Sequence, residues 1–543
     1  MDTLHKRLLA MGGVVLLVLS AFMFTGCGND DDATVTPVPE QTNFISATLI
    51  ESLSFNDVIK NAGETDETGP LHRKRQEIVQ RMWTEMNAKA KTTAGLKLKK
   101  NNGTNVTLHS ENEMQTFLAN NNFKIDELCP WVDAYNITYS TTSATGEIIN
   151  NASARVLINY GTVGFYTWYA DTDAILLHCH ATQMENSKTP TSQRGFGMSE
   201  CGLLYGEAWN DIMVVSPDYE GYGNTKDRVH PYLIQDVAGK QCWDAGCAAK
   251  YWKTHEGYGG FEDNFYTVPA GFSQGGSVAL ATQNYIQNND PDDRLRLRGS
   301  LCGDGPYDPF ATYSKYADDS YGLYLPSVIT LILRSYLYYY KDSYLKGYTV
   351  EDYLQPAVIA NLQKNDPDGK GNVWGMIDSK TKSTSDVDGV IKDAVGKKDK
   401  DSILVSDLIT DTARDPNSGA YKALKAALDA NNLTDPAKWS GGKNNKTIGI
   451  MHWQNDEAVP YANYEALNNG TYKVMDKGWN VVEKYLIEQL GVFLAAYGIS
   501  DGLTDVVKLF DNENVHAGAH VAAGKLFFAG NIFFRRDYTF LPN

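Results

Sequence analysis

Apolar and polar positions follow two different patterns along the chain, and the pattern changes near residue 135. From Phe44 to about residue 130 the apolar positions recur with a helical period, as in residues 78–86. Beyond that point, short β-branched runs alternate with helix-like stretches. The runs are apolar on both faces, which is typical of a parallel sheet covered by helices on two sides. The predicted strands are Arg155–Asn159, Ala174–His178, Ile212–Val215, Phe265–Val268, Arg298–Cys302, Thr447–His452 and Val506–Phe510.

The alternation of strands and helices breaks down between about residues 310 and 443. Helical runs such as Ser327–Tyr344 and polar loops rich in Lys and Asp replace it there, which indicates an insertion. No repeat of fixed period is present, and this argues against propellers and solenoids. The sequence therefore predicts an α/β core in two parts. The expected segments are an N-terminal helical extension (44–134), the first part of the core (135–309), the insertion (310–443) and the second part of the core (444–543).

The N-terminus has the pattern of a secretory signal. Lys6 and Arg7 precede an apolar run, Leu8–Phe24, that stops at Gly26 and Cys27. Seventeen residues are marginal for spanning roughly 30 Å of hydrocarbon, and a small residue followed by Cys is where a lipoprotein peptidase cuts. We predict a signal peptide (1–26), an acylated Cys27 and a flexible, polar tether over 27–43. The alternative is an uncleaved anchor helix.

The net charge and the cysteine content limit the partners and cross-links that the protein is expected to have. The 543 residues carry 49 Lys and Arg against 66 Asp and Glu, a net charge of −17, which disfavours nucleic acid and anionic membrane surfaces as partners. An even number of cysteines in an exported chain permits disulfides, but no C-x-x-C spacing is present. We predict no specific bridge. The cysteines other than Cys27 are Cys129, Cys179, Cys201, Cys242, Cys247 and Cys302.

A serine in a glycine-rich turn carries the predicted chemistry. Gly271-x-Ser273-x-Gly275 follows an apolar strand and precedes a helix-forming stretch, which is the context of a nucleophile elbow. The sequence Gly498-x-Ser500-x-Gly502 matches the same pattern, yet it follows a helix rather than a strand. Ser273 is therefore the candidate nucleophile, and Ser500 is interpreted as a loop residue.

A serine hydroxyl needs a base and an orienting carboxylate, in the chain order Ser, Asp, His. Asp456 lies in the loop after the strand Thr447–His452, where catalytic groups gather in α/β sheets. Its neighbour Glu457 is the rival. His520 stands at a loop-to-helix junction and is favoured as base over His516.

When the serine attacks an acyl carbon, the acyl oxygen becomes an oxyanion, which needs two hydrogen-bond donors. One is expected to be the backbone N–H of Gln274, and the other the amide of Ala181 or Thr182 in the loop after the early strand. Metal binding by residues 178–180 is disfavoured because successive side chains of a strand point to opposite faces. The segment Asn365–Gly371 lacks the acidic ligands of a calcium loop. No metal and no cofactor are predicted.

With these residues the chain resembles the α/β-hydrolase superfamily, and within it the secretory lipase and esterase branch. The resemblance covers about residues 135–530. It implies a mostly parallel central sheet flanked by helices, with the insertion at 310–443 forming a helical cap. Ala181 departs from the Gly of the family's His-Gly-Thr, and Pro269 is unusually close to the elbow. The segments that carry the resemblance are His180–Thr182, Pro217–Gly223, His230–Leu233, the elbow, Gly305–Asp308 and His452–Pro460.

The first residues carry a resemblance of their own. Phe24-Thr25-Gly26-Cys27 is similar to a bacterial lipobox with Phe where Leu is usual, and Gly28–Asp32 is similar to the acidic tag of surface lipoproteins of Bacteroidota. This implies an exported protein that is lipid-anchored in the bacterial envelope, at the outer membrane and exposed on the surface.

The prediction that combines these features is an extracytoplasmic serine carboxylic ester hydrolase of the esterase or lipase type, with Ser273, Asp456 and His520 as its triad. Its expected partners are a small-molecule or glycan-borne ester and the membrane that Cys27 enters. One alternative is a serine peptidase of the same fold, although such enzymes usually carry a gating domain and the chain has no propeller repeat. The other is a non-catalytic glycan-binding surface lipoprotein.

Overall fold

The computed structural model describes residues 43–476, apart from Met198, residues 317–321, 400–401, 440–445, 454–455, 470 and 473, together with His520. All of them belong to one compact unit, Thr42–Asn543. Several predictions lie outside the described residues. They concern the signal peptide, Cys27 and most of the tether, Ser500, the strand Val506–Phe510, His516 and the helix after His520.

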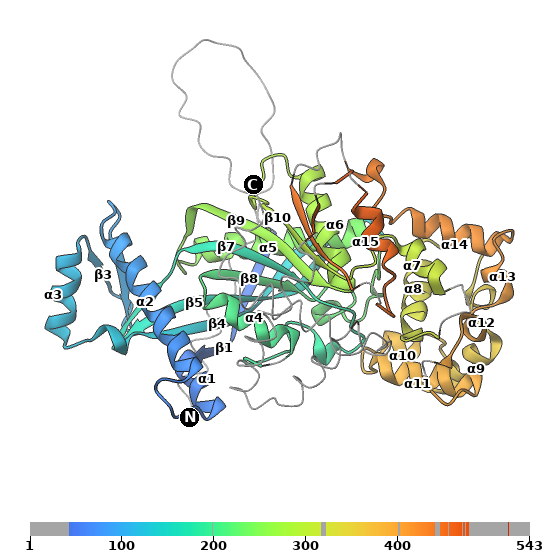
Figure 1. Cartoon of the computed structure of the whole chain (residues 1–543), viewed down its shortest axis with the longest axis horizontal. Coiled ribbons are helices and arrows are strands. Elements are labelled where there is room, and N and C mark those ends of the chain that lie inside the picture. Colours follow the sequence, from blue (N-terminus) through green and yellow to red (C-terminus); the bar gives the residue numbers. More distant parts are fainter. Residues whose placement is uncertain are drawn as a thin grey trace, which may run out of the picture. The chain divides into compact units, whose positions relative to one another are not determined.

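A single mixed sheet organises the described residues (Figure 1). One half of it is parallel, and the predicted strands of that half are confirmed. Its residues are apolar on both faces because helices cover both sides. In spatial order this parallel half consists of β8 (Ile212–Pro217), β7 (Thr172–Cys179), β9 (Phe261–Phe272), β10 (Gly299–Gly303), β11 (Thr447–Met451) and β12 (Val474–Asp476).

The other half of the sheet is antiparallel, so the prediction of a mostly parallel sheet is wrong for the sheet as a whole. The predicted strand Arg155–Asn159 belongs to β5 (Ile148–Val163), which runs antiparallel to β8 and joins the two halves. The remaining strands are β4 (Cys129–Thr142), β1 (Phe44–Ser54), β6 (Tyr166–Tyr169), β2 (Leu96–Lys100) and β3 (Asn105–Leu108).

The prediction of a helical extension over 44–134 is incomplete. This segment contains β1, β2, β3 and the start of β4 in addition to its helices. Here β1 pairs with β4 from Phe44 to Ser54. The backbone groups of β4 need partners along that edge, and this distant pairing outweighs the ambiguous periodicity of a short amphipathic run.

The helices of the extension begin and end where local chemistry requires. Ser54 and Asp57 form a capping box at the start of α1 (Phe55–Ala62), and Gly63 ends that helix with a φ of 69°. Pro70 occupies the first turn of α2 (Pro70–Ala90), which contains the predicted helical run at 78–86. A third helix, α3, spans Glu111–Asn121.

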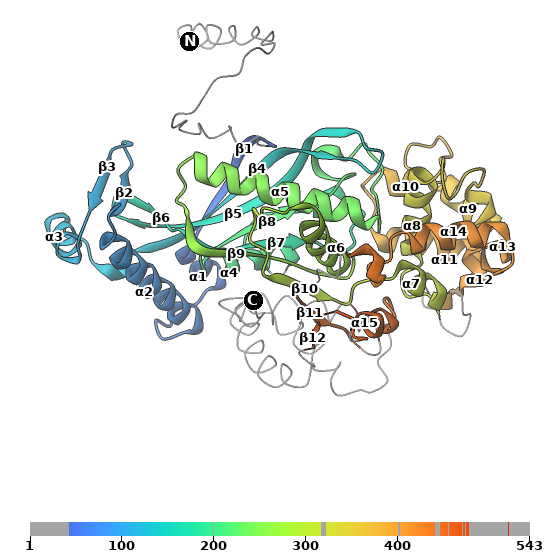
Figure 2. The ribbon, with the colours of Figure 1, turned by 90° about the horizontal axis from the view of Figure 1, so that it is seen from above.

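Helices pack on both faces of the parallel strands. In β7, Ile175 and Leu177 belong to the same apolar cluster as residues of α5 (Gln235–His255), whereas Leu176 lies between them in sequence and joins the cluster that contains α4 (Glu200–Ala208) and α2. Successive side chains of a strand point to opposite faces, which explains the split. Figure 2 shows α5 and α2 on opposite sides of the strands.

Residues 309–438, which we call the helical insertion, lie between β10 and β11 in the chain, and their apolar cluster also includes Met184 and residues 232–234 of the core. This is the region where the sequence predicts an insertion. Its α-helices are α7 (Pro309–Tyr316), α8 (Pro326–Tyr339), α9 (Pro356–Lys364), α10 (Gly375–Asp378), α11 (Thr384–Val395), α12 (Val405–Leu408), α13 (Asp411–Arg414) and α14 (Gly419–Asp429).

The order of the parallel strands, the helix α6 (Gln274–Asn289) that follows β9 directly, and the helices on both faces make this an α/β-hydrolase fold, as predicted. After β11 the chain continues into the short helix α15 (Ala462–Leu467). Within the described part of the chain, no helix has both the length and the apolar composition needed to cross a bilayer.

Candidate active site

Ser273 occupies a strained turn between β9 and α6. Its φ of 57° and ψ of −125° fall in a region that side chains rarely adopt. The turn is fixed by the Ser273 amide, which donates to the carbonyl of Gly303 over 2.9 Å. A Cβ on Gly275 would lie 1.9 Å from the carbonyl oxygen of Cys179, and one on Gly271 would lie 2.3 Å from it. Both glycines are therefore required by close packing of the backbone.

Asp456 lies just beyond the end of β11 and is 2% exposed. Its Oδ1 accepts the backbone N–H groups of Ala458 and Val459, each over 2.7 Å. These two bonds fix the carboxylate, and its second oxygen, Oδ2, lies 2.6 Å from Nδ1 of His520.

His520 joins the carboxylate to the serine. Its Nε2 lies 2.9 Å from Oγ of Ser273, while Nδ1 contacts Asp456. The rival carboxylate of Glu457 instead accepts the backbone N–H of His520, with both oxygens at 3.2 Å. The structure therefore brings the predicted Ser273, Asp456 and His520 together and places Glu457 on the main chain of the histidine rather than on its ring.

Asp456 and His520 each stabilise the charged form of the other. Burial favours the neutral form of both groups, but their mutual attraction and hydrogen bond outweigh it. The pKa of His520 is consequently raised above its usual value, and that of Asp456 is lowered. Such a pair stabilises the imidazolium that forms when the ring takes a proton from Ser273.

The two alternatives for the second oxyanion donor differ in their contacts. The amide of Ala181 donates to the carboxylate of Glu200, at 3.0 Å to Oε1 and 3.3 Å to Oε2. That N–H already has an acceptor, which disfavours Ala181 and favours the amide of Thr182. Gln274 begins α6, where the first N–H groups of a helix lack an acceptor within the helix.

The histidines of the predicted oxyanion loop support this loop. Nε2 of His178 lies 2.9 Å from the same Glu200 carboxylate, and its Nδ1 lies 2.6 Å from Oγ of Ser216. The ring of His180 stacks on that of Tyr219 with centroids 4.0 Å apart. These side chains are buried and have hydrogen-bond partners, so their contacts are those of structural residues rather than of metal ligands.

A buried carboxyl group beside the triad was missed by the sequence reasoning. Asp304 follows β10 with a φ of 38° and is fully buried, and its Oδ1 accepts the backbone N–H of Trp453 over 2.7 Å. Burial and the nearby charge of Asp456 raise its pKa well above the usual value. The signal available was an acidic residue two positions after the predicted strand Arg298–Cys302.

Asp304, Asp456 and His520 are also the one group of three potential metal ligands that lie close together within the described residues. Both ring nitrogens of His520, however, already contact Asp456 and Ser273. A metal bound to this ring would have to break that chain of hydrogen bonds, so the residues fit a proton relay better than a metal centre.

His230 positions the side chain of Gln274. Its Nε2 accepts from the amide nitrogen of Gln274 over 2.8 Å, and its Nδ1 donates to the carbonyl of Glu220 over 2.8 Å. Burial lowers the pKa of His230 to about 3, so the ring is neutral, as these two bonds require. The His230–Leu233 segment that carries the family resemblance thus contacts the residue after the nucleophile.

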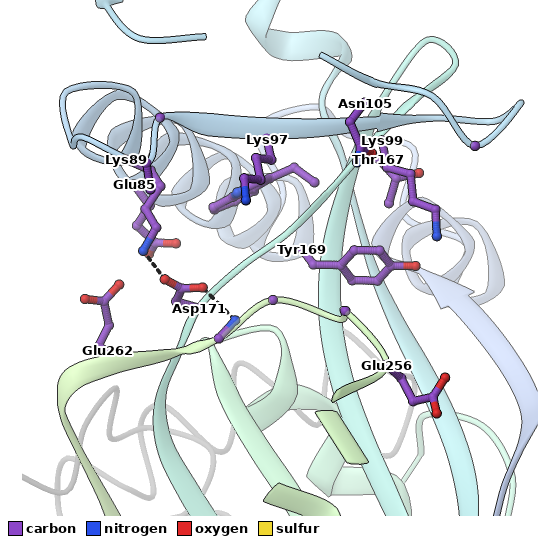
Figure 3. A pocket seen from close by; sticks show the side chains of 17 residues that line it. Glu85, Lys89, Lys97, Lys99, Asn105, Thr167, Tyr169, Asp171, Glu256 and Glu262 are labelled. Carbon is purple, nitrogen blue, oxygen red and sulfur yellow. Dashed lines mark hydrogen bonds and ion pairs between the residues drawn. The ribbon is translucent and has the colours of Figure 1, made fainter. Parts of the chain in front are cut away.

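A separate pocket, which we call the N-terminal pocket, lies at the end of the sheet that contains β2 and β6. Its cavity of about 700 Å³ is lined by residues of α2, β2, β6 and the loop before β9, and none of the triad residues lines it. Figure 3 shows Lys97 and Lys99 on the wall opposite Glu256 and Glu262, with the ring of Tyr169 between them. Three lysines face four carboxylates there, and Lys89 and Asp171 form an ion pair within the pocket.

No protein-family model matches the chain, and no curated protein matches it either. Solved structures are similar to it at low sequence identity. The rice cell wall degrading esterase LipA from Xanthomonas oryzae is 20% identical with a TM-score of 0.48, and the likeness covers 71% of this chain and 92% of that one. A Legionella pneumophila protein whose hydrolase assignment is provisional is 15% identical with a TM-score of 0.49, covering 87% and 99%. Candida antarctica lipase A in its closed state is 14% identical with a TM-score of 0.43, covering 68% and 78%.

Proposed function

We propose that the chain is a serine carboxylic ester hydrolase that works through an acyl-enzyme intermediate on Ser273. The observation that carries the proposal is the continuous chain of hydrogen bonds from Oγ of Ser273 through the ring of His520 to Asp456. A hydroxyl aligned on a base that is itself oriented by a buried carboxylate is the arrangement that activates serine as a nucleophile.

In the first half of the reaction, Oγ of Ser273 attacks the acyl carbon while Nε2 of His520 takes its proton. Asp456 holds Nδ1–H and stabilises the imidazolium. The carbonyl oxygen becomes an oxyanion, for which the amides of Gln274 and Thr182 are the proposed donors. The imidazolium then gives its proton to the leaving alcohol, and the acyl group remains on Ser273.

In the second half, water replaces the alcohol. Nε2 of His520 takes a proton from the water as its oxygen attacks the acyl carbon, and the proton then passes to Oγ of Ser273 as the acid leaves. Each step uses the same ring nitrogen, so the orientation that Asp456 imposes on the ring serves both halves. No cofactor or metal enters this scheme.

We also propose that the protein is exported and held to the bacterial envelope, at the outer membrane, by lipid on Cys27. The signal pattern and the Gly26-Cys27 junction support this. Radioactive palmitate should label the wild-type chain in cells but not Cys27→Ser. Equal labelling of the two would contradict the anchor.

A fluorophosphonate probe tests the class of enzyme directly, because it bonds covalently to activated serines. Wild-type protein should be labelled and should hydrolyse 4-nitrophenyl butyrate, whereas Ser273→Ala should do neither. Ser500→Ala is the matched control, since Ser500 lies in the same sequence pattern but after a predicted helix. Labelling that survives in Ser273→Ala and disappears in Ser500→Ala would refute the assignment, and no labelling at all would favour a glycan-binding protein.

A further inference from the structure

The helical insertion buries a lysine against the core. Lys380 lies between α10 and α11, is 3% exposed and has a φ of 55°. Its backbone carbonyl accepts the N–H of Asn186 over 2.8 Å, which ties this turn to the chain that follows the predicted oxyanion loop. Its Nζ lies over the ring of Tyr222, 5.0 Å from the centroid. The side chain therefore points from the insertion into the core.

The carboxylate whose charge acts on Lys380 is that of Asp378, which Lys380 shares with Arg334. No hydrogen bond or ion pair joins its Nζ to a described residue. The carboxylate nearest in sequence, Asp378, is held by Arg334 through contacts of 2.9–3.1 Å. Burial lowers the pKa of Lys380 to about 8, so the ammonium is still mostly protonated at neutral pH. Two cations that share one carboxylate leave a net positive charge, and where that charge is buried it attracts an anion.

Contacts connect this ammonium to both sides of the proposed oxyanion site. The hydroxyl of Tyr222 donates to the carbonyl of Gln183, the residue after Thr182, and the Tyr222 ring centroid lies 4.9 Å from that of His230. His230 in turn holds the side chain of Gln274. Lys380 thus faces an aromatic residue that contacts both halves of the site.

The same region contains further polar atoms that lack partners. The side-chain oxygens of Gln183 and Gln274 are buried, and neither has a hydrogen-bond partner among the described residues. These oxygens accept hydrogen bonds and cannot hold a carboxylate, which is itself an acceptor. The anion-binding group of this region is therefore the ammonium of Lys380.

We propose that Lys380 determines substrate specificity by binding a single carboxylate carried by the ester substrate. The proposal rests on the proposed ester hydrolysis, because it places the carboxylate beside the reacting carbonyl. Arg334 is already paired with Asp378, so one positive charge is left to be matched, and a monoanion matches it. A doubly charged phosphate would leave an uncompensated negative charge in the same buried surroundings.

Two pairs of esters test this inference. 4-Nitrophenyl hydrogen succinate and 4-nitrophenyl butyrate differ by a carboxylate on the acyl side. 4-Acetoxybenzoate and its methyl ester differ by a carboxylate on the alcohol side. Wild-type protein should prefer the anionic member of at least one pair. In Lys380→Met the ratio of kcat/KM, anionic over neutral, should fall about 10- to 100-fold, the range of one charge-assisted hydrogen bond.

Lys341→Met is the matched control. Lys341 also belongs to the insertion and also lies over a tyrosine ring, at 5.5 Å from Tyr338, but it is exposed. Its substitution should leave both ratios unchanged. Because each ratio compares two substrates on one preparation, partial misfolding of a variant does not alter it. Unchanged ratios in Lys380→Met for both pairs, or an equal loss on charged and neutral esters, would overturn the inference.

A binding measurement separates this inference from the proposed function. Calorimetry with succinate and with 4-hydroxybenzoate should detect binding to wild-type protein and a loss of at least tenfold in affinity in Lys380→Met. If neutral and anionic esters both fail to react, the proposed hydrolysis is wrong, and the calorimetry still decides whether Lys380 binds a carboxylate. If the neutral esters react while no carboxylate binds, the role of Lys380 is wrong and the hydrolysis stands.

Discussion

Two polar regions of the molecule differ in how their charged groups are used. The N-terminal pocket has a volume of about 700 Å³ and is lined by lysines and carboxylates, of which Lys89 and Asp171 are paired. At the triad the groups are buried, and the hydrogen bonds of the His520 ring connect Asp456 to the hydroxyl of Ser273. Convergence on one atom, rather than the size of a cavity, is what indicates catalysis.

The two regions also differ in the part of the sheet that forms them. The triad lies where the carboxyl ends of parallel strands meet, which brings the turns after β9, β10 and β11 side by side. The pocket is formed by the antiparallel strands β2 and β6 together with α2 and a loop. Antiparallel neighbours present opposite ends at each edge, so they do not gather successive loops in this way.

The largest effect should come from removing the charge that orients the base. Asp456→Asn keeps the shape of the side chain but removes its charge, and it should lower kcat for 4-nitrophenyl butyrate by about 10,000-fold, as expected for the acid of a serine triad. Glu457→Gln is the matched control and should lose less than tenfold, because the carboxylate of Glu457 accepts the backbone N–H of His520 and leaves the ring to Asp456. Equal losses in the two variants would contradict the assignment of Asp456.

The dependence of kcat/KM on pH should also reveal the charge of Asp456. Nε2 of His520 accepts a proton only when the ring is neutral, so kcat/KM should fall about tenfold for each pH unit below the apparent pKa of the free enzyme. That pKa should lie above the usual 6.5, because Asp456 raises it. In Asp456→Asn the residual activity should persist to lower pH. If both proteins show the same dependence of kcat/KM on pH, a group other than His520 causes the fall in activity at low pH.

Much of this geometry could be read from the sequence, and the exceptions have physical reasons. Strands that are apolar on both faces, such as β7 and β9, are predicted because burial on two sides leaves a clear pattern. The sequence predicts helix at the edge strand β1 because only its pairing with β4, far along the chain, defines it as a strand. The choice between Ala181 and Thr182 depends on Glu200, whose contact with the Ala181 amide no local pattern reveals.

A smaller effect is expected from Asp304, which lies beside Asp456 but should carry no charge. Burial and the charge of Asp456 raise its pKa and so favour the neutral acid, and Asn at this position keeps an oxygen for the N–H of Trp453. Asp304→Asn should therefore change kcat/KM by less than about threefold and leave the pH profile in place. A loss above tenfold, or a displaced limb, would show that Asp304 is ionised and shares the role of Asp456.

Substitutions in the N-terminal pocket should have the smallest effect on hydrolysis. Lys97 and Lys99 are exposed and line this pocket, where no triad residue contributes to the wall. The double variant Lys97→Ser with Lys99→Ser should keep the wild-type rate on 4-nitrophenyl butyrate within about twofold, because surface charges beyond a Debye length of about 10 Å are largely screened at 0.1 M salt. Measurement at 10 mM and 100 mM salt would check this reason. A loss of activity that persists at the higher ionic strength would mean that the pocket and the triad are coupled through the fold. The pocket would then belong to the functional site.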